Sequence, residues 1–541
     1  MVVNLRKRLK SRITIQMLFL LLIVLVGALV RLIWLERNPI GLHQDEAYSA
    51  YNAWTVMHYG MDSYGYTRPV YYTVWGSGMS VLYSYLTMPL FALWGIHVWT
   101  IRLPQAILGC LCIPVAYSLG KELFDSKMGL VFAGLIAINP WHIQQSRFGL
   151  DANLAVPALL FSMYFLVRYL NGKRKSIWGA AVFLGLTLYC YALTWLLVPT
   201  CLLLCLLFFH KRFVFDRSLF GAVLLLFLIA LPLLLFLMVN FGWIEELRTP
   251  IFSIPRLYAM RTDEMKLSLS LIKRRVLWML TLLWSQHDNM WWISNEQVGS
   301  YYYFSTPFIL LGMAYHVKVF FEWCFRKKEL PLHFILAIWF VVAFLMGCSI
   351  DMAMYHKVNY IHIPIILYGG LGLVCVGKLL LFIGQKAQII WIAAAACMYL
   401  AAFGYYLYTQ VSFEASYESY GYPSLSHMLW YQYDEALNRA QEIAQTNELT
   451  SGCIAVMGLN YANVMLYDRI SPKEFMETAV YLDDVPAFRT LLSFGRYRFD
   501  LTPEDETADA VFVYPYMFQE SFEGAGYTTE YVTPCYGVAY K

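Results

Sequence analysis

An acidic pair, Asp45-Glu46, closely follows the first apolar run of the chain. An ionised group beside a lipid phase is costly to hold and is often functional. Asp45 could act as a general base that takes a proton from an acceptor hydroxyl while a phosphate leaves. Glu46 would then orient Asp45 or bind a metal. The structural alternative makes Asp45 the N-cap of a helix that opens at this point.

A second acid lies in the short segment 146–153, where Arg147 and Asp151 are four positions apart. The two side chains would simply pair if a helix carried both of them. The functional alternative makes Asp151 a second acid of the site and Arg147 a contact for a phosphate.

Two further polar segments contain candidate ligands. His287-Asp288 offers two metal-ligating side chains, although an interfacial loop explains the same residues. His356-Lys357 precedes a late apolar run, where Lys357 either snorkels to the membrane interface or neutralises a lipid phosphate. The sequence has no Gly-rich nucleotide loop and nothing that suggests nucleic acid.

The elements that position these residues are membrane helices. Of the 541 residues, 59% are hydrophobic and 14% charged, against about 25% charged in an average soluble protein. Eleven apolar runs can be drawn, with the basic loops between them on the cytoplasmic side. The N-terminus is then cytoplasmic and uncleaved. Outer loops cover about 36–98, with Asp45-Glu46, and 241–301, with His287-Asp288. We expect 78–95 to form an interface helix; the alternative is a twelfth span.

Charge divides the chain near residue 411. Residues 412–541 contain 19 acids and 7 bases, whereas the whole chain has a net charge of +4. The apolar runs end at the same place. We therefore expect a membrane domain, 1–411, and a small soluble α/β domain, 412–541, outside the cytoplasm.

Four stretches resemble the C-type glycosyltransferases, integral membrane enzymes that use polyprenyl-phosphate sugars. The closest likeness is to bacterial relatives of the protein O-mannosyltransferases and aminoarabinose transferases, and it covers about 1–410. The stretches are Asp45-Glu46 after the first span, Trp99–Pro104 opening the second, Arg147…Asp151 before the fourth, and Asn359-Tyr360…Pro364 opening a late span.

The resemblance implies an outward-facing cavity that a lipid-linked donor enters from the side. It assigns Asp45 as the catalytic acid, with Asp151 as the acid of the second outer loop. Family members often have an Arg near the late stretch; His356, Lys357 and Tyr360 stand here as substrate-binding candidates. Metal use varies in the superfamily, so a divalent cation is a candidate cofactor.

We therefore predict a polytopic α-helical plasma-membrane glycosyltransferase. It would move a hexosyl or pentosyl group from a polyprenyl-phosphate donor to an extracytoplasmic hydroxyl of a glycan, protein or lipid, with inversion. The principal alternative is a transporter or flippase of lipid-linked glycans, which should show internal repeats and broken helices at mid-membrane. The sequence shows no convincing repeat. A non-catalytic scaffold is a third reading, for which so many spans are unnecessary.

Overall fold

The computed structural model describes residues 2–260, 269–290, 293–326, 328–351, 353–411, 429–446, 452–482, 489–505 and 509–541. They form two compact units. The first comprises Met1–Ile33, Arg102–Pro232 and Thr262–Thr409, and the second comprises Trp34–Ile101, Leu233–Arg261 and Gln410–Lys541. Arg261 and Lys266, two bases of the second outer loop, fall outside the described residues.

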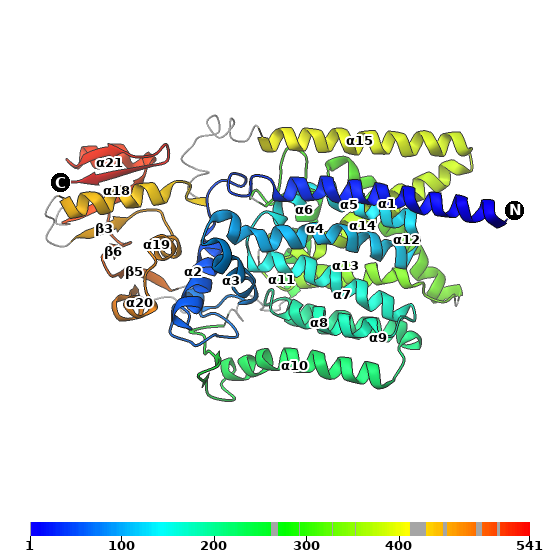
Figure 1. Ribbon diagram of the computed structural model, residues 1–541, viewed down its shortest axis with the longest axis horizontal. Coiled ribbons are helices and arrows are strands. Elements are labelled where there is room, and N and C mark those ends of the chain that lie inside the picture. Colours follow the sequence, from blue (N-terminus) through cyan, green and yellow to red (C-terminus); the bar gives the residue numbers. More distant parts are fainter. Residues whose placement is uncertain are drawn as a thin grey trace. The chain divides into compact units, whose positions relative to one another are not determined.

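The first unit is helical, and its long helices run roughly parallel to one another (Figure 1). Its elements are α1 (Val2–Leu32), α4 (Val98–Leu123), α5 (Ser126–Ile138), α6 (Pro140–Ser146), η2 (Asp151–Leu154), α7 (Ala155–Leu170), α8 (Ser176–Leu188), α9 (Thr194–Phe209), α10 (Arg217–Asn240), α11 (Leu269–Ser285), α12 (Thr306–Arg326), α13 (Ile335–Cys348), η7 (Asn359–Ile361), α14 (His362–Leu381) and α15 (Gln385–Val411).

Within the described residues, eight helices are long and apolar enough to cross a membrane. Three shorter apolar helices, at Ser126–Ile138, Ser176–Leu188 and Leu332–Cys348, lie where three further spans were expected. The expectation of a helical, polytopic membrane protein is confirmed, and the count of eleven spans stays a prediction.

Helices α12 and α14 approach each other closely because two glycines lie at their contact. A Cβ atom on Gly312 would lie 2.2 Å from the carbonyl oxygen of Tyr368, and one on Gly372 would lie 1.9 Å from that of Phe308. Small residues allow such backbone contact, which is a common way for helices to associate in membranes. This pair therefore forms a tightly packed part of the unit.

The second unit combines the first outer loop with the C-terminal residues. The loop supplies α2 (Gln44–Tyr59) and α3 (Leu82–Trp94). Helix α3 has 13 residues; its interfacial position, as opposed to a twelfth span, stays a prediction. A small antiparallel pair, β1 (Leu247–Arg248) and β2 (Ser253–Ile254), comes from the second outer loop.

The C-terminal residues form a mixed sheet with strand order β4-β5-β6-β3-β7-β9-β8. Strand β3 is central and parallel to both of its neighbours, and the other pairings are antiparallel. The expected small α/β fold is confirmed. Its strands are β3 (Cys453–Val456), β4 (Val480–Leu482), β5 (Thr490–Phe494), β6 (Tyr497–Arg498), β7 (Ala510–Pro515), β8 (Thr528–Tyr531) and β9 (Tyr536–Tyr540); its helices are α18 (Tyr433–Thr446), α19 (Tyr461–Tyr467), α20 (Pro472–Thr478) and α21 (Gln519–Gly524).

Candidate functional site

The acidic pair lies in the first turn of α2. The N-cap of this helix is His43, not Asp45, so the capping alternative for Asp45 is wrong. His43 Nδ1 accepts a hydrogen bond from the Asp45 amide at 3.2 Å, and Glu46 Oε2 accepts one from the His43 amide at 3.0 Å. This reciprocal arrangement is a capping box, which satisfies two backbone donors at a helix start.

The two acids of the pair therefore differ in environment. Glu46 is completely buried and caps the helix. The side chain of Asp45 is 30% exposed, and one of its oxygens lies 3.8 Å from His43 Nδ1. Because Nδ1 accepts the Asp45 amide, that nitrogen has no proton to share with the carboxylate, so we do not regard the contact as an ion pair. Asp45 is the acid of the pair that remains accessible.

The first unit contains a buried chain of amide side chains that joins three of the motif-bearing stretches. Asn359 Nδ2 donates to Asn153 Oδ1 at 2.8 Å. Gln105 Nε2 donates to Gln145 Oε1 at 2.8 Å and to the Asn153 carbonyl at 3.1 Å. Asn153 Nδ2 in turn donates to the carbonyls of Gln145 and Phe148. These contacts fix the 145–153 segment against α4 and η7.

Arg147 lies at the C-terminal end of α6 and is 7% exposed. Its two terminal nitrogens donate to the carbonyls of Val30 at 2.6 Å and Ile33 at 2.7 Å. Burial lowers the pKa of this guanidinium to about 10, so it remains charged at neutral pH. Arg147 thus fastens the end of α1, which is a structural task in addition to any contact with a ligand.

Asp151 opens η2 and is 9% exposed. Its Oδ1 accepts the amide of Ala152 at 2.7 Å. Arg147 and Asp151 do not share a helix, because α6 ends at Ser146 before η2 begins. An i, i+4 contact within one helix is therefore ruled out, and whether the two side chains pair stays a prediction. Asp45 and Glu46 belong to the other unit.

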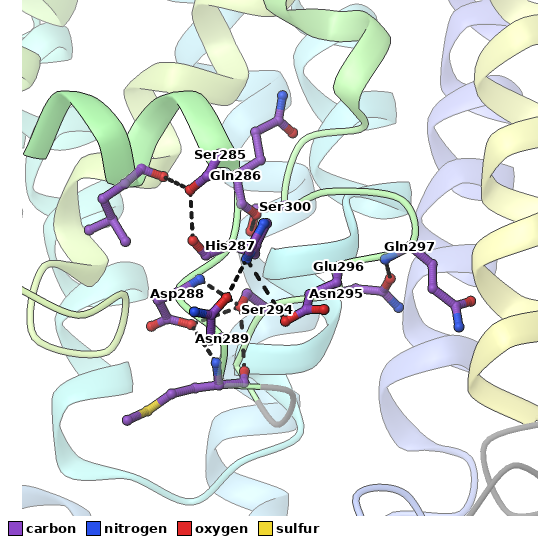
Figure 2. A network of polar contacts seen from close by, with 12 residues as sticks. Ser285, Gln286, His287, Asp288, Asn289, Ser294, Asn295, Glu296, Gln297 and Ser300 are labelled. Carbon is purple, nitrogen blue, oxygen red and sulfur yellow. Dashed lines mark hydrogen bonds and ion pairs between the residues drawn. The ribbon is translucent and has the colours of Figure 1, made fainter. Parts of the chain in front are cut away.

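The segment that contains His287 and Asp288 forms a compact polar network (Figure 2). Asp288 Oδ1 accepts a hydrogen bond from Ser294 Oγ at 2.8 Å, and Asp288 Oδ2 accepts one from the Tyr355 amide at 2.9 Å. His287 Nδ1 lies 2.9 Å from Asn289 Oδ1. Within the described part of the chain, no group of three His, Cys, Asp or Glu could hold a metal ion. The network explains both residues as loop-forming groups.

Asp288 brings this loop next to the late stretch, since Tyr355 directly precedes His356-Lys357. Both His356 and Lys357 are half-buried. Tyr360 is 1% exposed, and its hydroxyl has no hydrogen-bond partner among the described residues. Its carbonyl accepts Trp339 Nε1 at 2.8 Å. Tyr360 is therefore a core residue with an unused hydroxyl.

Sequence reasoning missed Gln105, Asn153 and Arg31 as structural determinants. Arg31, fully buried in α1, donates to the carbonyls of Gly27, Ile136 and Ala137. The available signal was a polar side chain inside an apolar run, which is expensive unless it finds partners. Such residues can be noted from sequence, but their partners cannot be identified.

Comparisons with known proteins show which family and which folds this chain resembles. A family model described as dolichyl-phosphate-mannose-protein mannosyltransferase matches residues 79–236. A subunit of the dolichyl-diphosphooligosaccharide–protein glycosyltransferase, STT3B from Oryza sativa subsp. japonica, is 46% identical over 59 residues. That match covers 10% of this chain and 8% of the relative's length.

The fold is similar to that of ArnT from Cupriavidus metallidurans bound to undecaprenyl phosphate, with a TM-score of 0.57 and 15% identity, over 96% of this chain and 97% of that one. An Archaeoglobus fulgidus oligosaccharyltransferase tethered to an acceptor peptide gives a TM-score of 0.50 and 15% identity, over 84% of this chain and 63% of that one. The resemblance to C-type membrane glycosyltransferases is confirmed. The similarity in fold to ArnT extends beyond residues 1–410.

Proposed function

We propose that this protein is a glycosyltransferase that moves a sugar from a polyprenyl-phosphate donor to an acceptor hydroxyl outside the cytoplasm. Asp45 acts as the general base. As it takes the hydroxyl proton, the acceptor oxygen bonds to the anomeric carbon and the bond from that carbon to the phosphate oxygen breaks. The polyprenyl phosphate leaves, and the anomeric centre is inverted.

One observation supports this role above the others: the Asp45 carboxylate is the accessible acid of the pair. Its side chain is 30% exposed, whereas Glu46 is completely buried and accepts the His43 amide in the capping box. A general base must reach the proton that it removes. The family match at 79–236 and the ArnT-like fold support a polyprenyl-phosphate donor.

Donor binding is assigned to basic and polar groups of the first unit. Lys357 is half-buried, and no hydrogen bond or ion pair of its ammonium group occurs within the described residues. We propose that Lys357 contacts the donor phosphate, and that His356 and Tyr360 of the same segment also contribute to donor binding. Arg147 and Asp151 complete the proposed set, and Arg147 serves its structural contacts as well. The N-terminus is proposed to be cytoplasmic, and residues 412–541 to form an extracytoplasmic domain.

The first experiment tests the base. The experiment compares wild type with Asp45→Asn. Each protein is placed in lipid with a panel of polyprenyl-phosphate sugars, and the release of polyprenyl phosphate is measured. The variant should lose about 100-fold or more in turnover, since general base catalysis contributes on the order of 10²–10⁴. Glu245→Gln is the matched control, because Glu245 is an exposed acid of the same unit.

Near-normal turnover of Asp45→Asn would remove Asp45 from the chemistry. If no donor is consumed and the lipid-linked sugar moves between leaflets instead, the protein is a transporter.

The second experiment tests the phosphate contact. Lys357→Gln should raise the donor KM several-fold while leaving the fold intact. Lys378→Gln is the control, because Lys378 is an exposed lysine in the last turn of α14, at the opposite end from the Lys357 segment. Equal donor KM values in the two variants would contradict a phosphate contact at Lys357.

A further inference from the structure

The turn that presents Asp45 is held by the C-terminal residues of the chain. The Leu42 amide donates to the Leu429 carbonyl at 2.7 Å. Asn463 Nδ2 donates to the Leu42 carbonyl at 3.1 Å. Both backbone groups of Leu42 are thus engaged by residues more than 380 positions away in the sequence.

Two further contacts involve His43 itself and the next residue, Gln44. Asn460 Nδ2 donates to Gln44 Oε1 at 3.0 Å, and the ring of Trp430 lies 6.5 Å from that of His43. Trp430 is itself anchored, since its Nε1 donates to the Gly458 carbonyl at 2.9 Å. The turn is therefore clamped by the 429–430 segment and by the N-terminal part of α19.

Asn463 is the most deeply placed of these partners. It is completely buried in α19, and its Oδ1 has no hydrogen-bond partner among the described residues. Removal of the Asn463 donor would leave the buried Leu42 carbonyl without this partner, so the hydrogen bond is costly to lose. Asp45 lies three residues beyond Leu42, in the first turn of α2.

We infer that Asn463 is a positioning residue for Asp45, and that the C-terminal domain holds the base in its reactive orientation. The inference rests on the proposed function, because it assumes that Asp45 is the base. A displacement of about 1 Å in a reacting group can cost on the order of 100-fold in rate. Loss of the Asn463 contact should therefore reduce kcat more than it reduces donor binding.

The test compares Asn463→Leu with Tyr51→Phe in the full-length protein. Tyr51, in the middle of α2, donates its hydroxyl to the Ile470 carbonyl at 2.8 Å. Each variant removes one buried hydrogen bond between the first outer loop and the C-terminal residues, but only the first bond lies at the turn before Asp45. We expect similar losses of thermal stability, together with a kcat loss of roughly tenfold or more in Asn463→Leu alone.

Two additional measurements separate this inference from the proposed function. In an Asp45→Asn background, Asn463→Leu should have no further effect on turnover, because it acts through Asp45. Hydrogen exchange of the Leu42 amide should accelerate in Asn463→Leu and not in Tyr51→Phe, whatever the role of Asp45. Near-normal turnover in Asp45→Asn would reject the base. Equal kcat values in Asn463→Leu and Tyr51→Phe, or fully additive effects with Asp45→Asn, would reject the positioning role.

If Asn463→Leu does not fold, Asn460→Ser provides the same test. Serine keeps the N-cap of α19 that Asn460 provides, since Asn460 Oδ1 accepts the Ala462 amide, but it lacks the donor for Gln44. A several-fold kcat loss with unchanged donor KM is expected. Unchanged kcat would contradict the inference.

Discussion

Asn359 donates a hydrogen bond to the side-chain oxygen of Asn153 across 206 positions of sequence. The contact joins η7, which directly precedes α14, to the segment that contains Arg147 and Asp151. Both asparagines are buried, at 1% and 3% exposure. Two of the stretches that first suggested a glycosyltransferase are therefore parts of one hydrogen-bonded structure.

Removal of the two asparagines should have unequal costs. The Asn153 side chain makes three hydrogen bonds, to the Gln145 and Phe148 carbonyls and from Asn359, whereas the Asn359 side chain donates one. At about 1 kcal/mol for each bond, Asn153→Ala should destabilise by about 3 kcal/mol and Asn359→Ala by about 1 kcal/mol. Thermal unfolding of both variants in one detergent shows which substitution destabilises the protein more. Equal losses of stability would show that the network is not centred on Asn153.

The capping role of Glu46 predicts that its charge matters less than its shape. Glu46→Gln should keep most of the activity, because a Gln oxygen can still accept the His43 amide. Glu46→Ala should lose about 1 kcal/mol of stability. Turnover and thermal stability of the two variants provide the comparison. A folded but inactive Glu46→Gln would place this carboxylate in the chemistry itself.

Gly41 is required by the close contact with Leu429. Its φ is +78°, and a Cβ atom there would lie 2.1 Å from the Leu429 carbonyl oxygen. Gly60, at the other end of α2, has φ +71° with nothing within 4 Å of its Cβ position. Gly60→Ala should therefore cost about 1 kcal/mol from backbone strain alone, whereas Gly41→Ala should cost more and also lower kcat. The measurements are thermal stability and kcat. If the two variants have equal values of both, the turn is not clamped by the contact with Leu429.

Asp62 predicts a pH-dependent stability. It is completely buried, and burial raises its pKa from 3.8 to about 7, although the amides of Tyr64 and Tyr66 bond to its Oδ1. Between those pH values the folded state binds more protons than the unfolded state, so stability falls as pH rises through this window. The total change is on the order of a few kcal/mol.

Asp62→Asn should remove this dependence, because the amide keeps an oxygen for Tyr64 and Tyr66 and carries no charge. The measurement is the Tm of wild type and variant at pH 5 and pH 8. A wild-type Tm that drops between the two values, with a flat response in the variant, is expected. Parallel changes in both proteins would assign the dependence to other groups.

The sequence alone determined the local features of this protein. Apolar runs gave the eight long helices within the described residues, because the length and hydropathy of a span are local properties. The helix that opens at the acidic pair, α2, was also predicted from local pattern. In contrast, the strand order of the C-terminal sheet was not predicted, because short strands depend on distant pairing partners, as β9 does on β7.

Only the tertiary structure decided which polar groups meet. The link from Asn359 to Asn153, and the link from Asn463 to Leu42, join residues hundreds of positions apart. Nothing in the local sequence identifies such partners, since many arrangements would satisfy the same buried amides. The sequence therefore identified Asp45 as a candidate base, whereas the fold showed that Glu46 caps its helix and that the C-terminal residues hold its turn. The reason is that hydropathy is a property of neighbouring residues in the sequence, whereas hydrogen-bond partners depend on how distant segments pack against one another.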